Sequence, residues 1–372
     1  MSNGNCQLFK SAENFFNCLN VNFDDTVSVI IVTHVLDNPQ PYLDFLKRNF
    51  NLALVLAKSG SASSKTVGDK AVNYPILVKS REELSNQEVV VEIINSYCPI
   101  GRLVLVDTGG YFSELLADIT DLLTCDLLGV IEVTENGLQR YEKKYQNNMP
   151  ILTVARSPLK GPEDFWTGRS IVFSAEVLLR EIHIIPNGQK AVVFGYGKLG
   201  QSICSSLQAL NIHISVVELC PQRAIQAHCR GLKVEEKKAA ISESTLVFCA
   251  TGNKALMPED YQHLKSGAFI CTVTSADDEI FLPREVDGYL SEPVTKNIRK
   301  YGGNGKYFYI ANNGNAINFI HNAEVGPYIF LVQAEIIQCI DQIARIGADC
   351  RIGELDKEFR NRIASIWLKH FE

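Results

Sequence analysis

The sequence contains no run of apolar residues that approaches the roughly 18 needed to span a membrane. Positive charge is also scarce, because 36 lysines and arginines stand against 42 aspartates and glutamates, for a net charge of −6. That balance argues against a surface for nucleic acid or anionic membranes. The opening MSNGNCQLFKSAENFF lacks a charged start and an apolar centre. We therefore expect no secretory signal there and a cytoplasmic protein.

Metal-ligand spacing is missing too, because the seven histidines are dispersed and none has cysteine or acid partners in a metal-binding pattern. We therefore expect no metal site. The eleven cysteines include no C-x-x-C pair. Several, such as Cys249 and Cys271, fall in apolar runs typical of buried strands. Reduced core thiols are favoured over disulfides, which remain the alternative.

The chain does contain enough residues, 372, for two domains, and its 46% hydrophobic content is that of a globular protein. The first half alternates Val/Ile/Leu runs with stretches of helical spacing. Continuous runs, rather than strict alternation, indicate parallel strands covered on both faces. We predict such strands at 27–33, 52–58, 75–80, 102–108, 127–133 and 150–155.

A long helical stretch at 165–183 ends in a Pro-Asn-Gly break at 186–188, beyond which a second series of strands and helices begins. We predict an α/β protein of two α/β domains. The expected bounds are 1–183 for the first domain, 328–372 for the C-terminal helices that complete it, and 184–325 for the second domain.

The stretch AVVFGYGKLGQSICSSL, residues 191–207, joins an apolar strand to a helix through three glycines at G-x-G-x-x-G spacing. Gly195 would allow the tight turn, Gly197 the approach of backbone N–H groups to a pyrophosphate, and Gly200 close packing of helix on strand. The helix N-terminus would add partial positive charge at the phosphates. A dinucleotide site is favoured over a plain structural turn.

Glu218 ends the next strand, 23 residues after Gly195, close to the spacing of an acid that binds a ribose hydroxyl. A carboxylate there would repel a 2′-phosphate, so NAD is favoured over NADP, although the nearby Arg223 blunts the preference. We therefore predict that 184–325 is a Rossmann-type NAD-binding domain, that 1–183 is a second α/β substrate domain, and that an interdomain cleft lies between them. The stretches CATGN and CTVTSADDEI end later strands of this series, and we expect the turns in them to line the dinucleotide. The alternative is that they are ordinary strand-end turns. The remaining predicted cofactor contacts in this region are Lys198, Leu199, Thr251, Gly252, Asn253 and Thr274.

Six segments, in order, resemble motifs of the S-adenosylhomocysteine hydrolase family. VVFGYGKLGQSICSSLQAL…VVELCPQRAIQAHCRG is similar to the family's cofactor domain. IIVTHVLDN resembles its CLHMT segment, LVDTGGYFSELL its DDGGD segment, and GVIEVTENGLQRYEKKYQNNMPILTVARS its EETTTG stretch. LKGPEDFWTGRS resembles its K-x-x-x-D-N segment and NGNAIN its G-R-x-V-N stretch. The likeness is loose in identity but collinear over roughly residues 25–335.

The resemblance implies an enzyme in which tightly held NAD oxidises a ribose hydroxyl. A proton is then removed, the thiol leaves, water adds and the hydride returns. It implies a small-molecule substrate and a homo-oligomer. Lys160 and Asp164 would bracket the hydroxyl, His34 and Asp107 would line the opposite wall, and Asn318 would lie near the nicotinamide.

Taken without the resemblance, the same residues allow plainer interpretations. Lys160 could be a solvated loop lysine and Asp164 a helix N-terminal acid. His34 could be a satisfied core histidine. Asp107, at the carboxyl end of a strand, could be a ligand residue or the cap of the next helix.

Several positions depart from the family pattern. Thr108 replaces an aspartate, Val133 a glutamate that holds the ribose, and Phe165 an asparagine. A pocket that loses such groups loses proton transfer and sugar binding, so hydrolysis of S-adenosylhomocysteine is doubtful. The other departures are Leu36 and Asn38, at the expected adenine contacts, and Ser275, in place of a histidine.

Three functions remain open at this point. The first is a divergent enzyme that uses NAD to oxidise a hydroxyl of a nucleoside-, sugar- or cyclitol-like substrate. The second is a non-catalytic NAD-binding regulator, and the third is a genuine adenosylhomocysteinase with a diverged pocket. Retention of Lys160 and Asp164 favours the first over the second.

Overall fold

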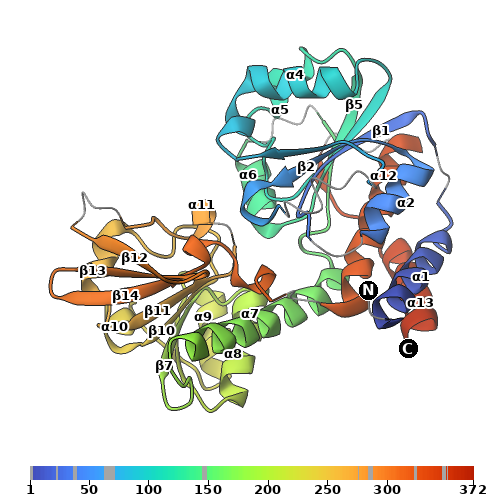
Figure 1. Cartoon of the computed structure of the whole chain (residues 1–372). Coiled ribbons are helices and arrows are strands. Elements are labelled where there is room, and N and C mark those ends of the chain that lie inside the picture. The colour runs from blue at the N-terminus through green and yellow to red at the C-terminus, as the bar shows by residue number, and fades with distance from the viewer. Residues whose placement is uncertain are drawn as a thin grey trace. The chain divides into compact units, whose positions relative to one another are not determined.

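The computed structural model describes the chain apart from residues 1–2, 22–23, 37–39, 63–71, 145–148, 275, 284–287, 322–324, 346–348 and 350. It forms two compact units (Figure 1). Unit 1 comprises Met1–Lys160 and Gly326–Glu372, and unit 2 comprises Gly161–Val325.

The boundary between the units lies at Lys160 and not at the expected residue 183. The long helix α7 (Gly161–Glu181) belongs to unit 2 because it packs on α8 (Lys198–Ala209). The two helices approach so closely that a Cβ on Gly168 would lie 2.5 Å from the side chain of Ser202. The hydroxyl of Ser202 also donates to the carbonyl of Phe165, at 2.5 Å.

Unit 1 is built on a seven-stranded sheet in the order β15-β6-β5-β4-β1-β2-β3. Every pair in it is parallel, as the continuous apolar runs predicted. The strand order reverses between β4 and β1, which makes their carboxyl ends the expected ligand crevice. The strands are β1 (Val27–Thr33), β2 (Asn51–Lys58), β3 (Ile76–Lys79), β4 (Arg102–Asp107), β5 (Asp126–Glu132), β6 (Ile151–Thr153) and β15 (Ile352–Gly353).

Helices cover both faces of this sheet (Figure 1). Alternate residues of β1 divide between two cores, with Val29 and Ile31 in one and Ile30 and Val32 in the other. The first face carries α1 (Asn3–Asn17), α2 (Pro41–Asn49), α12 (Ile329–Arg345) and α13 (Lys357–Phe371). The second carries α4 (Gln87–Tyr97), α5 (Leu116–Thr120) and α6 (Glu135–Lys144). Short 3-10 turns include η1 (Ser59–Ser61), η2 (Glu83–Ser85), η3 (Pro158–Lys160) and η8 (Gly326–Tyr328).

Unit 2 is built on an eight-stranded sheet in the order β12-β13-β14-β11-β10-β7-β8-β9. It is parallel from β14 to β9, and β12, β13 and β14 run antiparallel to one another. The order reverses at β7, between β10 and β8. The strands are β7 (Lys190–Phe194), β8 (His213–Val217), β9 (Lys233–Val234), β10 (Leu246–Cys249), β11 (Ala268–Thr272), β12 (Leu290–Thr295), β13 (Ile298–Gly303) and β14 (Lys306–Ala311).

The faces of the second sheet are covered in the same way (Figure 1). Ala191 and Val193 pack toward α7, α8 and α9 (Pro221–Cys229), and Val192 and Phe194 pack toward α10 (Lys237–Glu243) and η4 (Pro258–His263). The remaining elements are α11 (Ala276–Glu279), η6 (Asn312–Gly314) and η7 (Ile317–Phe319). Among the described helices none is both long and apolar enough to cross a bilayer.

Candidate cofactor and substrate sites

The glycine loop of unit 2 lies at the carboxyl end of β7, where the strand order reverses. Gly195 has a φ of +85°, and a Cβ there would lie 2.6 Å from the carbonyl oxygen of Ala250. A Cβ on Gly200 would lie 2.0 Å from the carbonyl oxygen of Gly195. Around Gly197, in contrast, no atom lies within 4 Å of a Cβ position. Gly195 and Gly200 thus pack tightly against backbone, whereas Gly197 has free space around it. Gly197 is the position that a pyrophosphate must approach.

Glu218 is tied directly to this loop. Its carboxylate accepts from the backbone N–H groups of Tyr196 and Cys220, both at 2.7 Å. Arg223 donates to both carboxylate oxygens, at 2.9 and 3.0 Å. Burial alone would raise the pKa of Glu218, but Arg223 and the two backbone donors hold that pKa below its ordinary value. Glu218 is therefore ionised, and Arg223 neutralises it.

The strand-end turn after β10 is held by a residue that the sequence analysis missed. The buried carboxylate of Glu279 accepts from the N–H of Thr251 and the N–H of Gly252, both at 2.8 Å. It also accepts from the hydroxyls of Thr251 and Thr274, again at 2.8 Å. Asn253 lies exposed at the same turn. One acid thus fixes the loops after β10 and β11, and no local sequence pattern distinguishes it from its acidic neighbours.

The start of α7 lies beside the start of α8, next to the glycine loop. Asp164, in the first turn of α7, is buried, and its Oδ2 lies 3.6 Å from Nζ of Lys198. Leu199 packs against the core of unit 2. Asn318, in η7, is buried, and its Oδ1 has no hydrogen-bond partner among the described residues. An orphaned buried acceptor in this unit fits a ligand that brings an N–H donor, as a carboxamide does.

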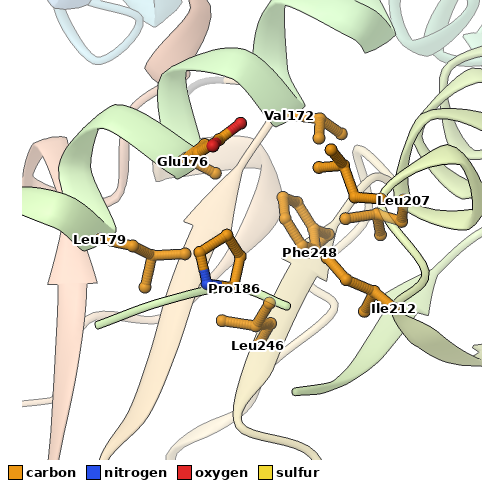
Figure 2. A pocket seen from close by; sticks show the side chains of 10 residues that line it. Val172, Glu176, Leu179, Pro186, Leu207, Ile212, Leu246 and Phe248 are labelled. Carbon is orange, nitrogen blue, oxygen red and sulfur yellow. The ribbon is translucent and has the colours of Figure 1, made fainter. Parts of the chain in front are cut away.

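A small recess also occurs in unit 2, but at the other end of the strands (Figure 2). It lies where Pro186 precedes β7 and Leu246 begins β10, and its lining is apolar apart from Glu176. Parallel sheets bind ligands at the carboxyl ends of their strands. The recess therefore marks a gap between α7, α8 and the sheet, distinct from the glycine loop.

In unit 1, two acids lie side by side under the switch point. Asp107 and Glu132 are register partners on β4 and β5, and both side chains are fully buried. The Asp107 carboxylate accepts from the N–H of Phe112 at 3.0 Å and from the hydroxyl of Tyr141 at 2.7 Å. Its side chain does not reach the surface. Of the two interpretations of Asp107, the structure favours the structural one, in which it fixes the loop after β4.

Glu132 likewise fixes loops, in this case those that follow β4 and β5. Its carboxylate accepts from the N–H groups of Gly109 and Gly110, at 3.1 and 2.9 Å. It also accepts from the N–H and hydroxyl of Thr134, at 2.7 and 2.8 Å. Burial and repulsion from Asp107 raise the pKa of Glu132 to about 8. Burial raises the pKa of Asp107 as well, so the two carboxyls titrate as a pair that retains a proton near neutral pH.

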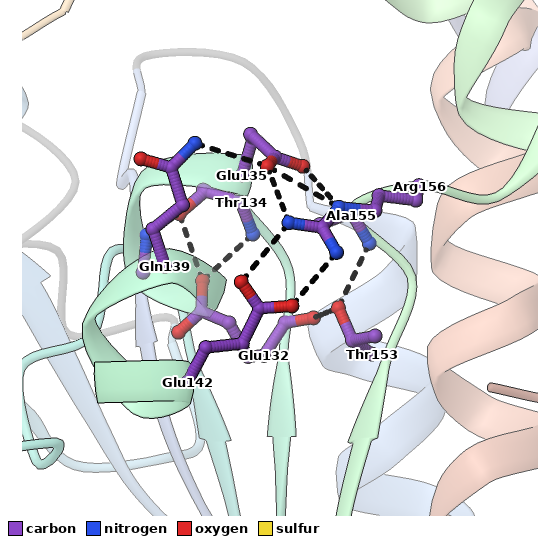
Figure 3. A network of polar contacts seen from close by, with 9 residues as sticks. Glu132, Thr134, Glu135, Gln139, Glu142, Thr153, Ala155 and Arg156 are labelled. Carbon is purple, nitrogen blue, oxygen red and sulfur yellow. Dashed lines mark hydrogen bonds and ion pairs between the residues drawn. The ribbon is translucent and has the colours of Figure 1, made fainter. Parts of the chain in front are cut away.

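An ion-pair network fixes the next loop (Figure 3). The guanidinium of Arg156 lies between Glu135 and Glu142 of α6, at 2.8 and 2.7 Å. The hydroxyl of Thr153 donates to the carbonyl of Glu132 at 3.0 Å. The segment after β6, which leads to Lys160, is thereby tied to α6 and β5.

His34 follows β1 at the switch point. Its Nδ1 lies 2.5 Å from the hydroxyl of Ser61. Burial lowers the pKa of His34 well below its ordinary value, and the positive charges of Lys58 and Lys160 lower it further. Lys160 thus acts electrostatically on His34, and both residues belong to unit 1, whereas Asp164 belongs to unit 2.

The departures from the family pattern occupy varied surroundings. Val133 packs within an apolar core cluster, and Phe165 is 42% exposed. Thr108 and Leu36 are partly buried. Asn38 and Ser275 lie outside the described residues. No group of three or more His, Cys, Asp or Glu side chains arranged to hold a metal occurs in the described part of the chain.

Residues 168–320, from within α7 to just beyond η7, match the family described as "S-adenosyl-L-homocysteine hydrolase, NAD binding domain". This part of the chain is thus similar to the NAD-binding domain of the S-adenosylhomocysteine hydrolase family. The segment matched contains the glycine loop, Glu218, Glu279 and Asn318. NAD is accordingly the cofactor of this domain, and the expectation of NAD is confirmed.

Curated relatives agree with this assignment at low identity. An adenosylhomocysteinase of Pyrococcus abyssi is 26% identical over 80% of this chain and 71% of its own length. An S-inosyl-L-homocysteine hydrolase of Methanopyrus kandleri is 26% identical over 72% of this chain, and the match spans 65% of that protein, under two thirds. A D-3-phosphoglycerate dehydrogenase-like structure from Ralstonia solanacearum covers 87% of this chain and 96% of its own at 13% identity, with a TM-score of 0.45. A likeness at that level carries no functional information.

We expect the buried acid pair of unit 1 to make stability depend on pH between pH 7 and 8. A carboxyl whose pKa is raised by folding contributes stability at low pH and loses it as pH rises toward the folded pKa, about 8 for Glu132. The free energy of unfolding of unit 1 should therefore fall by about 1 kcal/mol across this window. His34 contributes little to the pH dependence between pH 7 and 8, because its pKa is lowered by folding. A lowered histidine pKa changes the free energy of unfolding mainly at pH values below the ordinary pKa.

Thermal unfolding of matched variants tests this expectation. Asp107→Asn removes the repulsion and should flatten the dependence of the melting temperature on pH. The exposed Asp121→Asn is the control and should leave the slope as it is. A parent protein that is more stable at pH 8 than at pH 7 would contradict the assignment.

A second expectation concerns cofactor choice. Glu218→Ala should weaken NAD binding about 10- to 100-fold, because a charged acceptor and the anchor of the Tyr196 N–H are both lost. Arg223→Ala leaves the carboxylate in place without its neutralising partner, so NAD binding should persist while NADP binding falls. Calorimetry on the parent and both variants measures this. Tighter binding of NADP than of NAD by the parent protein would overturn the preference.

Proposed function

We propose that the protein is an NAD-dependent enzyme that oxidises a hydroxyl of a small nucleoside-, sugar- or cyclitol-like substrate other than S-adenosylhomocysteine. The observation that supports it is that Lys160, after β6, lies near enough to His34, after β1, to act on it electrostatically, in a chain that carries an NAD-binding domain. A regulator that only binds NAD has no need of a basic residue at a second crevice. A cytoplasmic homo-oligomer remains part of the prediction.

The residues of the chain have separate tasks in this proposal. Gly195, Gly197 and Glu218 hold the cofactor, and Asn318 offers its orphaned oxygen to a carboxamide. When bound, NAD would supply the hydride acceptor for the carbon that bears the hydroxyl. Lys160, whose charge acts on His34, would first have to lose its own proton and would then accept the proton of the hydroxyl.

The positions around Lys160 complete this assignment. Asp164 orients the substrate hydroxyl from the start of α7. His34, kept neutral by burial and by the nearby lysines, offers a hydrogen-bonding imidazole at the same edge as Lys160. Glu132 and Asp107 have a structural task in this proposal, because they fix the loop after β4 through hydrogen bonds to its backbone.

The names of the relatives bear on the substrate. One is named for hydrolysis of adenosyl and one for hydrolysis of inosyl homocysteine, so the nucleoside part varies between relatives. Here Thr108 and Val133 stand where the family pattern has a proton-transferring aspartate and a ribose-binding glutamate. We therefore infer that the oxidised hydroxyl belongs to a different compound.

The test is to purify the protein, identify its bound nucleotide, and screen nucleosides, sugars and cyclitols for NADH formation by absorbance. At least one class should give NADH at a rate that saturates with substrate. Bound NAD with no NADH from any class would favour the regulatory alternative, to which the loss of two acids at Thr108 and Val133 already lends support.

A further inference from the structure

The two halves of the unit 2 sheet have different tasks toward a dinucleotide. The first half, β7 and β8, carries the glycine loop and Glu218, which fit the pyrophosphate and the adenosine ribose. A dinucleotide-binding fold consists of two such mononucleotide-binding halves. The nicotinamide part of the cofactor is therefore expected at the turns that follow β10 and β11, beyond Cys249 and Thr272.

A single buried carboxylate holds both of these turns. Glu279, the last residue of α11, is fully buried. Its Oε1 accepts from the N–H and the hydroxyl of Thr251, both at 2.8 Å. Its Oε2 accepts from the N–H of Gly252 and the hydroxyl of Thr274, also at 2.8 Å. Burial raises the pKa of Glu279, but four donors shared between two oxygens oppose the rise and favour the ionised form.

The turn after β10 also touches the glycine loop. A Cβ on Gly195 would lie 2.6 Å from the carbonyl oxygen of Ala250, the residue that precedes Thr251. The hydroxyl of Thr251, which donates to Glu279, accepts in turn from the N–H of Asn253 at 3.0 Å. Glu279 is therefore one hydrogen bond away from a turn that adjoins the cofactor loop.

We propose that the negative charge of Glu279 makes the cofactor site of unit 2 prefer NAD⁺ to NADH. The nicotinamide ring is positively charged in NAD⁺ and neutral in NADH, whereas the adenosine and pyrophosphate parts are the same in both. A fixed negative charge near the ring stabilises NAD⁺ selectively, and burial strengthens the effect. Glu218, on the adenosine side, acts equally on the two forms. The proposal needs only cofactor binding, so it holds for an enzyme and for a regulator alike.

Dissociation constants of NAD⁺ and NADH, measured separately by calorimetry on the whole chain, test this preference. The parent protein should bind NAD⁺ more tightly than NADH. Glu279→Gln removes the charge at nearly constant size and should weaken both forms, because an amide cannot accept from all four donors. It should weaken NAD⁺ about 10-fold more than NADH. For a two-electron couple, that tenfold change raises the reduction potential of the bound cofactor by about 30 mV.

Two matched variants separate the charge of Glu279 from its structural task. Glu279→Asp keeps the charge on a shorter side chain, so it should weaken both forms of the cofactor and leave their ratio close to that of the parent. Glu218→Gln should also weaken both forms and leave the ratio unchanged. Equal weakening of NAD⁺ and NADH in Glu279→Gln would overturn the proposal and leave Glu279 a structural role. Tighter binding of NADH than of NAD⁺ by the parent would overturn it too, even where Glu279→Gln fails to fold.

Discussion

Replacing Lys160 by Met should lower substrate-dependent NADH formation about 1,000-fold while leaving NAD binding nearly intact. The proton of the oxidised hydroxyl would then lack its acceptor, whereas the glycine loop and Glu218 lie in the other unit and are untouched. Steady-state kinetics with the compound found by screening measures the first effect, and calorimetry with NAD measures the second.

The same variant has a consequence that needs no substrate. The charge of Lys160 lowers the pKa of His34, so the pKa of His34 should rise in Lys160→Met. The control is Lys144→Met, which removes an exposed lysine paired with Glu114 and should alter neither activity nor His34. Full activity in Lys160→Met would remove the catalytic assignment of Lys160.

Much of the fold could be predicted because buried parallel strands have an obvious sequence signal. The runs VSVIIVT and RLVLVD became β1 and β4, with each strand covered on both faces. The hairpin of β12 and β13 was missed, because β12, LSEPVT, is exposed along nearly its whole length and contains a proline. Exposed strands show neither an apolar run nor a clear alternation.

The domain boundary was misplaced for a related reason. A proline and glycine break is visible after α7, so the sequence suggests a boundary there. What decides the boundary is the side of α7 that packs on α8, where Gly168 meets Ser202. That contact is between residues 34 positions apart and leaves no local signal. The interdomain cleft remains a prediction.

Site residues could be predicted from the sequence where the local backbone allows only one residue type. Gly195 and Gly200 could be recognised because a side chain at either position would meet backbone. Glu132 and Glu279 could not, although each accepts four hydrogen bonds from the loops after two neighbouring strands. Both units thus use one buried acid to shape their ligand edge. The donors come from distant segments, so only the folded chain reveals the arrangement.

The protein should hydrolyse S-adenosylhomocysteine at less than about 0.001 per second, against about 1 per second or more for an ordinary enzyme. A pocket with Thr108 for an aspartate lacks a proton-transfer group, and Val133 lies within an apolar cluster where the resemblance implies a ribose-binding glutamate. A coupled assay for the released thiol measures the rate, with the reverse condensation of adenosine and homocysteine as a check. Turnover near 1 per second would show that these positions do not correspond to the family motif and would restore the adenosylhomocysteinase alternative.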